Sequence, residues 1–182
     1  MRRLIKNKSF LSSVALIVIV VTCFVLLANN INQKDQKRQM AIQTLNTEVS
    51  SFVTKKTTPQ NSATKLYAYD VGKREYVYNQ DYLPSTLRAD AIEELRGIVR
   101  LSLFKKGDYA YKAGNFFTTE SKVTYYDLKV IIVDLKTNTT VAEKTFTHEI
   151  EGYLEEGIKE IKPDEKEVQQ WILDVWSEHL RK

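Results

Sequence analysis

The polar and apolar positions of the chain divide it into an apolar segment and a longer stretch of mixed pattern. Residues 10–28 contain no charged residue, no Gly and no Pro. A helix that rises about 1.5 Å per residue covers about 28 Å over this segment, which matches a hydrocarbon core of about 30 Å. The pattern predicts a transmembrane helix over 10–28 after a short segment over 1–9, then a stalk and linker over 29–64 and a folded domain over 65–182.

Basic residues on the two flanks predict the orientation of this helix. The basic residues before it are Arg2, Arg3, Lys6 and Lys8. Those after it are more dilute and are offset by Asp35. The positive-inside bias favours a cytoplasmic N-terminus. We therefore expect a single-pass signal anchor in the cell membrane, with the domain on the outside.

Two other fates of the apolar segment remain open. Cleavage of a signal peptide after Ala28 would place Leu26 at the −3 position, where a small residue is preferred. Lipidation of Cys23 would lack the small residue expected just before the cysteine. In the predicted transmembrane helix, by contrast, Cys23 is simply a small apolar residue.

A heptad-like pattern follows the apolar segment. Four apolar residues at spacings of 3, 4 and 3 share one seam of a predicted helix: Ile42, Leu45, Val49 and Phe52. The seam predicts either a dimerising stalk or a helix whose stripe contacts the domain or the bilayer surface. Residues 54–63 are polar and contain a proline, which is typical of a connector.

Short apolar and alternating runs in the domain predict a sheet. Residues 66–71 and 76–78 are expected to form a hairpin, and residues 98–104 a strand. Residues 123–134 end in a run that is apolar on both strand faces, which is typical of a central strand. Residues 141–150 alternate less cleanly and are predicted to be its antiparallel partner nearer the edge.

The C-terminal segment has the pattern of an amphipathic helix. Pro163 is placed as a first helical residue, and acidic residues follow it at the positive end of the helix dipole. The residues expected to face the sheet are Val168, Trp171, Ile172 and Val175. The predicted fold class is therefore α+β: an antiparallel sheet of five or six strands with a C-terminal helix packed on one face.

Several phrases within residues 65–180 resemble small extracytoplasmic domains of bacterial hypothetical proteins and lipoproteins. These are the segments 83–89, a Glu-Glu turn into 97–99, 133–137, 144–147 and Trp171-Ile172. The resemblance implies membrane attachment and this fold, and it brings no catalytic residue with it. After Thr147 the chain departs from these domains, because a Gly-Pro-rich loop is replaced by an acidic segment.

The charge distribution argues against nucleic-acid binding. The chain has 27 Lys and Arg against 23 Asp and Glu and a sequence pI near 9.0. Residues 1–64 hold nine basic against two acidic residues, a net +7, whereas residues 65–182 hold 18 against 21, a net −3. The basic residues that raise the pI thus lie in the anchor and stalk, where they set the membrane orientation and attract anionic lipid headgroups. The expected partner list therefore includes the lipid bilayer and no nucleic acid.

The sequence offers few residues for catalysis or for a cofactor. The six glycines are never closer than five residues apart, so no Gly-rich phosphate loop is present. His148 and His179 are expected in surface or capping roles. The acidic residues that could either hold a calcium ion or form a solvated loop are Glu149, Glu151, Glu155, Glu156 and Glu160. A single cysteine excludes an internal disulfide. We expect no catalytic residue, no cofactor and no metal.

Tyrosine is the one compositional surplus, with ten in the chain. Pairs at strand period are Tyr67/Tyr69, Tyr76/Tyr78 and Tyr109/Tyr111. Exposed rows of this kind bind glycans or peptides through the ring faces and the polar hydroxyl, whereas half-buried rows simply pack within the sheet. These six tyrosines are the candidate ligand surface.

Together these patterns predict a binding or assembly module of the cell envelope. The expected partner is another envelope protein or a cell-wall component, and dimerisation through the stalk is a further expectation. An anchored enzyme acting on cell-wall glycan or peptide is the alternative, motivated by the tyrosines and the acidic segment.

Overall fold

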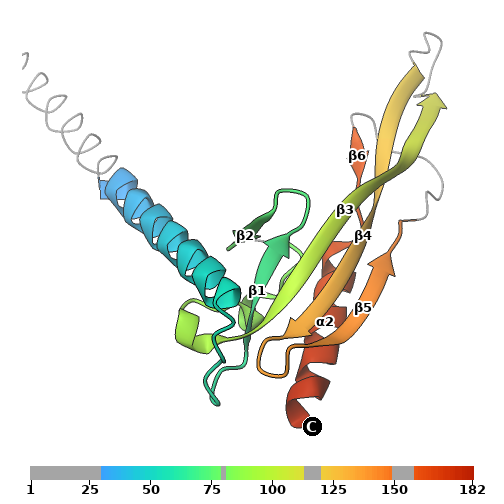
Figure 1. Cartoon of the computed structure of the whole chain (residues 1–182). Helices are drawn as coiled ribbons and strands as arrows, with labels where there is room; N and C mark the ends of the chain where they lie inside the picture. The colour runs from blue at the N-terminus through green and yellow to red at the C-terminus, as the bar shows by residue number, and fades with distance from the viewer. Residues whose placement is uncertain (1–29, 79–80, 113–119, 149–157) are drawn as a thin grey trace, which may run out of the picture. The chain divides into compact units, whose positions relative to one another are not determined.

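The computed structural model describes residues 30–78, 81–112, 120–148 and 158–182 (Figure 1). The chain divides into two compact units, Met1–Thr44 and Leu45–Lys182. The predicted N-terminal segment 1–9 and transmembrane helix 10–28 lie outside the described residues. Within the described ranges, no helix is both long and apolar enough to cross a membrane.

The described part of the first unit is helical. Residues 30–54 are helical without a break, and residues 30–44 fall in this unit. Ile31 and Met40 are each 58% exposed. Thr44 Oγ1 donates a hydrogen bond to the Met40 carbonyl oxygen at 2.9 Å, which is the back-bonding typical of Thr in a helix.

The second unit begins at Leu45, twenty residues before the boundary expected from the sequence. The boundary lies earlier because two residues of the apolar seam, Leu45 and Val49, are buried in the core of the second unit. Phe52 packs against the same cluster, which also contains the buried ring of Tyr67. Three residues of the heptad-like seam thus have partners within their own chain.

The second unit contains a six-stranded sheet and a C-terminal helix. Its strands are β1 (Lys65–Asp70), β2 (Glu75–Val77), β3 (Leu95–Lys112), β4 (Glu120–Asp134), β5 (Thr139–Phe146) and β6 (Glu160–Ile161). The order is β2-β1-β3-β4-β5, and β6 pairs with β4. Two 3-10 helices, η1 (Ser85–Leu87) and η2 (Ile92–Glu94), precede β3, and α2 (Glu165–Arg181) closes the chain. The α+β class and the C-terminal helix are confirmed.

The antiparallel sheet predicted from the sequence is wrong, because the sheet is mixed. β1 pairs with β3 in parallel, and β6 pairs with β4 in parallel. The pairs β1/β2, β3/β4 and β4/β5 are antiparallel. The long connection from β2 through η1 and η2 lets the chain cross back before β3 begins, and parallel neighbours require such a crossover.

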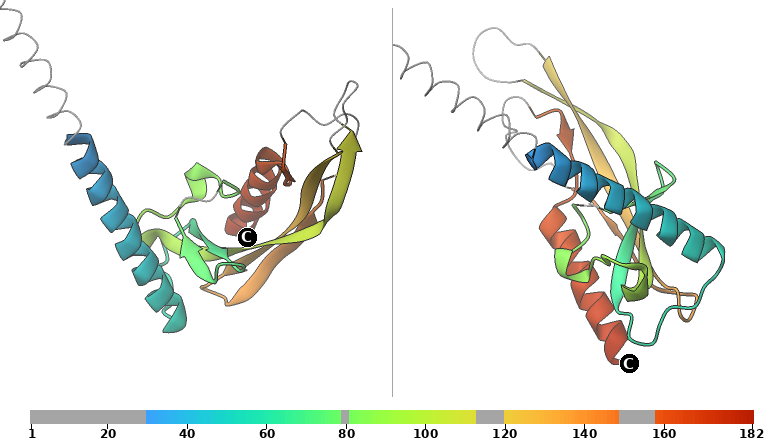
Figure 2. Two further views of the ribbon diagram at one scale, coloured as in Figure 1. Left: turned by 90° about the horizontal axis from the view of Figure 1, so that it is seen from above. Right: turned by 90° about the vertical axis from the view of Figure 1, so that its left-hand side faces the viewer.

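The helix α2 covers one face of the sheet (Figure 2). Its buried residues are Val168, Ile172 and Trp176, so Trp176 takes a core position that the sequence pattern gave to Trp171 and Val175, which are partly buried. The indole Nε1 of Trp176 donates to the Thr64 carbonyl oxygen at 2.7 Å. The bond satisfies the only polar atom of this buried ring and ties the helix to the segment that enters β1.

The opposite face of the sheet is covered in part by the helical residues that begin the second unit. The buried cluster on this face consists of Leu45, Val49, Tyr67, Ala89, Leu95 and Ile98. β3 and β4 continue past the ends of β1 and β5 as an arm, and the short strand β6 pairs with β4 along it (Figure 1). The sheet therefore has one face covered by α2 and another whose covering is incomplete.

Gly97 is the site of a close approach between the sheet and α2. A Cβ atom at this position would lie 2.7 Å from Trp176 Cη2, 2.7 Å from the Val133 carbonyl oxygen and 2.9 Å from Leu66 Cδ2. We predict that Gly97→Ala lowers the free energy of unfolding by about 2 kcal/mol, because the added methyl group forces neighbouring atoms of the packed core out of position.

Urea denaturation followed by tryptophan fluorescence measures this change. The control is Gly72→Ala, where the new Cβ would meet only Asp70 Oδ1, at 3.3 Å. If the two variants lower the free energy of unfolding equally, close packing at Gly97 is not the cause.

Candidate functional site: a groove between helix and sheet

A groove of about 930 Å³ lies on the incompletely covered face of the sheet. Residues 46–55 supply one wall, and β1, β2, β3 and the end of β4 supply the other. We call it the helix-sheet groove. All of its lining residues belong to the second unit. Its volume is near the upper end of what a small-ligand site encloses.

The helical wall of the groove is a stripe of short polar side chains: Asn46, Thr47, Ser50, Ser51 and Thr54. Members of this stripe recur at a spacing of four residues, so they share one face of the helix. The apolar seam with Leu45 and Val49 faces the core instead. The helix is thus amphipathic in a way that leaves hydrogen-bonding groups toward the groove.

The sheet wall of the groove includes a pair of tyrosines. Tyr69 of β1 and Tyr76 of β2 are register partners, with ring centroids 4.9 Å apart and an interplanar angle of 60°. Burial raises the pKa of the Tyr76 hydroxyl, the nearby Tyr69 raises it further, and Arg100 opposes both. Tyr76 therefore keeps its proton at neutral pH and can donate a hydrogen bond.

Two more of the predicted tyrosines pack beside this pair and outside the groove lining. Tyr67 is buried, and its hydroxyl donates to Asn46 Oδ1. Tyr78 is half-buried, and its hydroxyl donates to Asp90 Oδ1 at 2.5 Å. The ring centroid of Tyr67 lies 6.5 Å from that of Tyr76 and 6.3 Å from that of Tyr78. The Tyr67 hydroxyl is thus engaged within the core, where burial also raises its pKa.

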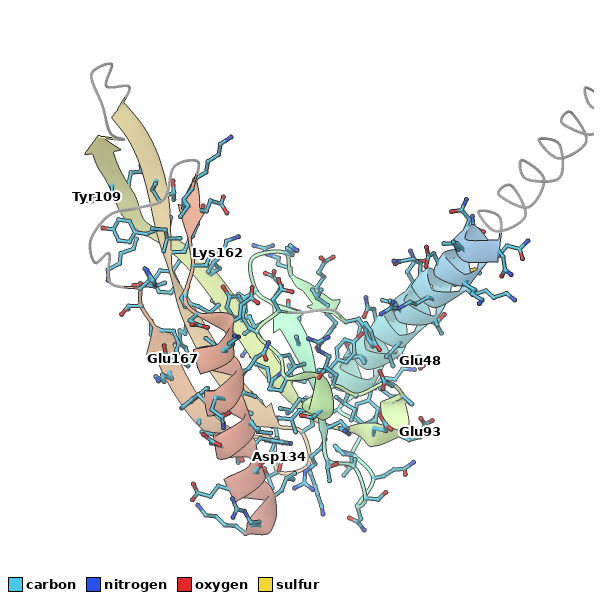
Figure 3. The ribbon with its side chains drawn as sticks, turned by 180° about the vertical axis from the view of Figure 1, so that it is seen from behind. Glu48, Glu93, Tyr109, Asp134, Lys162 and Glu167 are labelled. Atoms are coloured by element: carbon cyan, nitrogen blue, oxygen red, sulfur yellow. The ribbon has the colours of Figure 1, made fainter. Side chains whose placement is uncertain are left out.

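The six predicted tyrosines do not form one surface. Tyr69 and Tyr76 line the groove, whereas Tyr109 lies on the distal arm of β3 and is 44% exposed (Figure 3). Tyr111 lies further along β3, and its side chain is outside the described part of the structure. Strand periodicity placed these residues on a face, but burial by the helical residues 45–54 decided which of them line the groove.

Three basic side chains at the groove escaped the sequence reasoning: Lys55, Arg74 and Arg100. All three are exposed, and Glu75 is the one acidic residue among the groove lining. None of the three cations forms an ion pair or a side-chain hydrogen bond with another described residue. By contrast, Lys129 of β4, which lies on the same face of the sheet as Arg100, forms an ion pair with Glu143 at 2.6 Å. Their spacing in sequence, 55, 74 and 100, gave no signal that they converge.

Two groove residues have left-handed backbone conformations. Arg74 has φ of 58° and Asn138 has φ of 54°. Asn tolerates this region through its short polar side chain, whereas Arg there costs about 1 kcal/mol. A strained non-glycine residue at a groove is a reason to look for a function of its side chain.

A second group of titratable residues surrounds Asp134 at the end of β4 (Figure 3). The carboxylate is fully buried and accepts from Arg96 Nε at 2.9 Å and Arg96 Nη2 at 2.8 Å. It also accepts from His179 Nε2 at 2.7 Å and from the Lys136 backbone N–H at 2.7 Å. An ionised carboxylate only accepts, so His179 carries its proton on Nε2.

The environment of Asp134 is that of a structural ion pair. Burial alone would raise the pKa of this carboxyl, but the hydrogen bonds from Arg96, His179 and the Lys136 backbone outweigh it and hold the pKa well below its usual range. Asp134 therefore stays ionised and fully bonded, with no capacity left for a substrate. His179 lies in the last turn of α2, and its printed bond to the Asp134 carboxylate ties the helix to the end of β4 rather than capping the helix.

The remaining sequence candidates have no shared site in the described residues. His148 is exposed at the end of the β5 segment, and Glu160 forms an ion pair with Lys162 at 3.0 Å. The other members of the predicted acidic group, Glu149, Glu151, Glu155 and Glu156, lie outside the described residues. Within the described ranges, no group of three or more His, Cys, Asp or Glu is arranged to hold a metal ion.

Comparison of the chain with family models, with curated proteins and with solved structures gave no match.

The ion pair of Asp134 generates a prediction about acid stability. Arg96→Gln should lower the free energy of unfolding by about 3 kcal/mol at neutral pH, because it leaves a buried carboxylate without its cation. The folded-state pKa of Asp134 is depressed, so its contribution is complete above the unfolded value near 3.9 and is lost as pH falls further. The difference between the variant and the wild type should therefore shrink below about pH 4.

Urea denaturation at pH 7 and pH 3 measures both effects. Lys129→Gln, which removes an exposed pair with Glu143, serves as the control and should cost less than about 1 kcal/mol. If Arg96→Gln lowers the free energy of unfolding no more than Lys129→Gln does, the buried ion pair does not stabilise the fold in the way predicted.

Proposed function

We propose that this chain is a single-pass membrane-anchored protein whose extracytoplasmic domain binds a component of the cell envelope through the helix-sheet groove. The observation that carries the proposal is the groove itself, where Tyr69 and Tyr76 lie opposite a polar helical stripe beside three cations without described ion-pair partners. Such a combination of aromatic surface and convergent polar groups is typical of a binding site.

The anchor is supported by the chain before the described residues. The uncharged segment 10–28 has the length of a bilayer-spanning helix, and the basic residues before it favour a cytoplasmic N-terminus. This arrangement would put the domain outside the membrane, in reach of envelope proteins and of the cell wall.

The alternative of an anchored hydrolase is less well supported. Hydrolysis of a glycoside by the usual mechanism requires two carboxyl groups about 5 to 10 Å apart on either side of the bond. Glu75 is the one carboxylate among the described residues of the groove, and Asp134 is fully engaged in its ion pairs. Binding without turnover therefore fits the groove better than catalysis.

Cysteine labelling in intact cells tests the proposed topology. In a Cys23→Ala background, Glu93→Cys introduces a thiol at an exposed position of the domain, and Lys6→Cys introduces one before the apolar segment. A membrane-impermeant maleimide should label the first variant in intact cells and the second only after lysis. Labelling of Glu93→Cys that also requires lysis would overturn the proposed orientation.

Photo-crosslinking from within the groove tests the binding role. A benzophenone amino acid at Ser50, an exposed groove residue, should form adducts with an envelope component in intact cells. The matched control is the same amino acid at Glu167, which is exposed on α2 over the other face of the sheet (Figure 3). Adducts of equal yield from both positions, or from neither, would contradict a role for the groove.

A further inference from the structure

We infer that the helix-sheet groove binds an anionic glycan, that is, a chain of sugar rings bearing carboxylate or phosphate groups. This inference rests on the proposed function, because it names the ligand class of the same groove. It is carried by the charge of the groove, the conformation of Arg74, the polar helical stripe and the position of the groove on the sheet.

The charge of the groove is opposite to that of the domain around it. Residues 65–182 have a net charge of −3, yet the groove gathers Lys55, Arg74 and Arg100 against Glu75. The two guanidinium groups suit carboxylate and phosphate alike, since their donors match two oxygens at once. A concave site lined by one sign of charge also concentrates ligands of the opposite sign. The groove is therefore complementary to an anion.

Arg74 supports the same conclusion through its backbone. Its φ of 58° is a conformation that Asn or Gly adopts more readily, and its side chain makes no ion pair or hydrogen bond with the described residues. The strain of this residue is thus not offset by a contact within the described chain. The turn between β1 and β2 sets this backbone conformation, and an arginine there in place of Gly or Asn puts a guanidinium at the groove, where it suits a bound anion.

The uncharged groups of the groove fit sugar rings. Ser50, Ser51 and Thr54 carry hydroxyls that both donate and accept, as the hydroxyls of a sugar do. The rings of Tyr69 and Tyr76 offer apolar faces with a polar tip, which suits the C–H surface and the hydroxyl rim of a sugar. Because Tyr76 keeps its proton, its hydroxyl is available as a donor.

The position of the groove disfavours an extended acidic peptide. Peptides commonly bind sheets by adding a strand to a free edge, where unpaired backbone groups give most of the affinity. The groove lies over the face of the sheet, where β1 and β3 pair with each other and β3 pairs with β4. The edge strand β2 also lines the groove, but over the paired strands a ligand meets side chains rather than free backbone groups, which favours a glycan.

Equilibrium binding to the full chain in phosphatidylcholine nanodiscs tests the inference. The probes are tetragalacturonate and glucose 6-phosphate as carboxylated and phosphorylated sugars, with maltotetraose and tetraglutamate as a neutral glycan and an acidic peptide. We expect at least one anionic sugar to bind about ten-fold more tightly than both comparison probes. The better of the two anionic probes identifies carboxylate or phosphate as the preferred group.

Two variants connect this binding to the groove. Arg74→Asn should weaken binding of the anionic sugar about five-fold without lowering the melting temperature, because Asn accepts the left-handed conformation. Lys166→Gln removes one positive charge from an exposed position on α2 and should leave the affinity unchanged.

The inference is overturned if maltotetraose or tetraglutamate binds as tightly as the anionic sugars, if none of the probes binds at millimolar concentration, or if the two variants weaken binding equally. In each of these cases the crosslinking from Ser50 still reports on the groove. Failure of the ligand class is therefore distinguishable from failure of the binding function.

Discussion

The buried carboxylate of Asp134 is the constraint on which the second unit depends. A charge without access to water must be fully paired, and here the partners come from the start of β3, the turn after β4 and the last turn of α2. Leu135 N–H also donates to the Arg96 carbonyl oxygen at 3.0 Å, which continues the pairing beyond the strand. These bonds hold the end of β4 in place and with it Val133 and Leu135, which line the groove.

The two faces of the sheet differ because their coverings differ. The helix α2 presents Val168, Ile172 and Trp176 to one face, and it comes close enough at Gly97 to exclude a Cβ atom. The helical residues 45–54 present a narrower apolar stripe to the other face, with polar residues directly beside it. A groove forms where that stripe ends, because short hydroxyl side chains do not fill the space above Tyr69 and Tyr76. The same helix therefore contributes to the core and to the candidate site.

The parts of the fold that could be predicted are those set by local pattern. The hairpin of β1 and β2, the central β4 with its apolar run, the edge strand β5 and the helix α2 all follow from periodicity and turn residues within short segments. The parallel pairing of β1 with β3 could not be predicted, because side-chain alternation is the same in both strand directions. Only the route of the crossover through η1 and η2 sets the direction of β3 relative to β1.

The sequence by itself determined that Tyr67 and Tyr69 share a face of their strand, that Tyr76 and Tyr78 share a face of theirs, and that Leu45 and Val49 share a helical seam, since each is a matter of backbone period. Tertiary structure alone decided that this seam packs into the domain's own core, that Tyr67 is buried while Tyr69 and Tyr76 line a groove, and that Lys55, Arg74 and Arg100 converge beside them. The physical reason is that burial and charge convergence depend on which distant segments cover a face, and a local pattern contains no information about that partner.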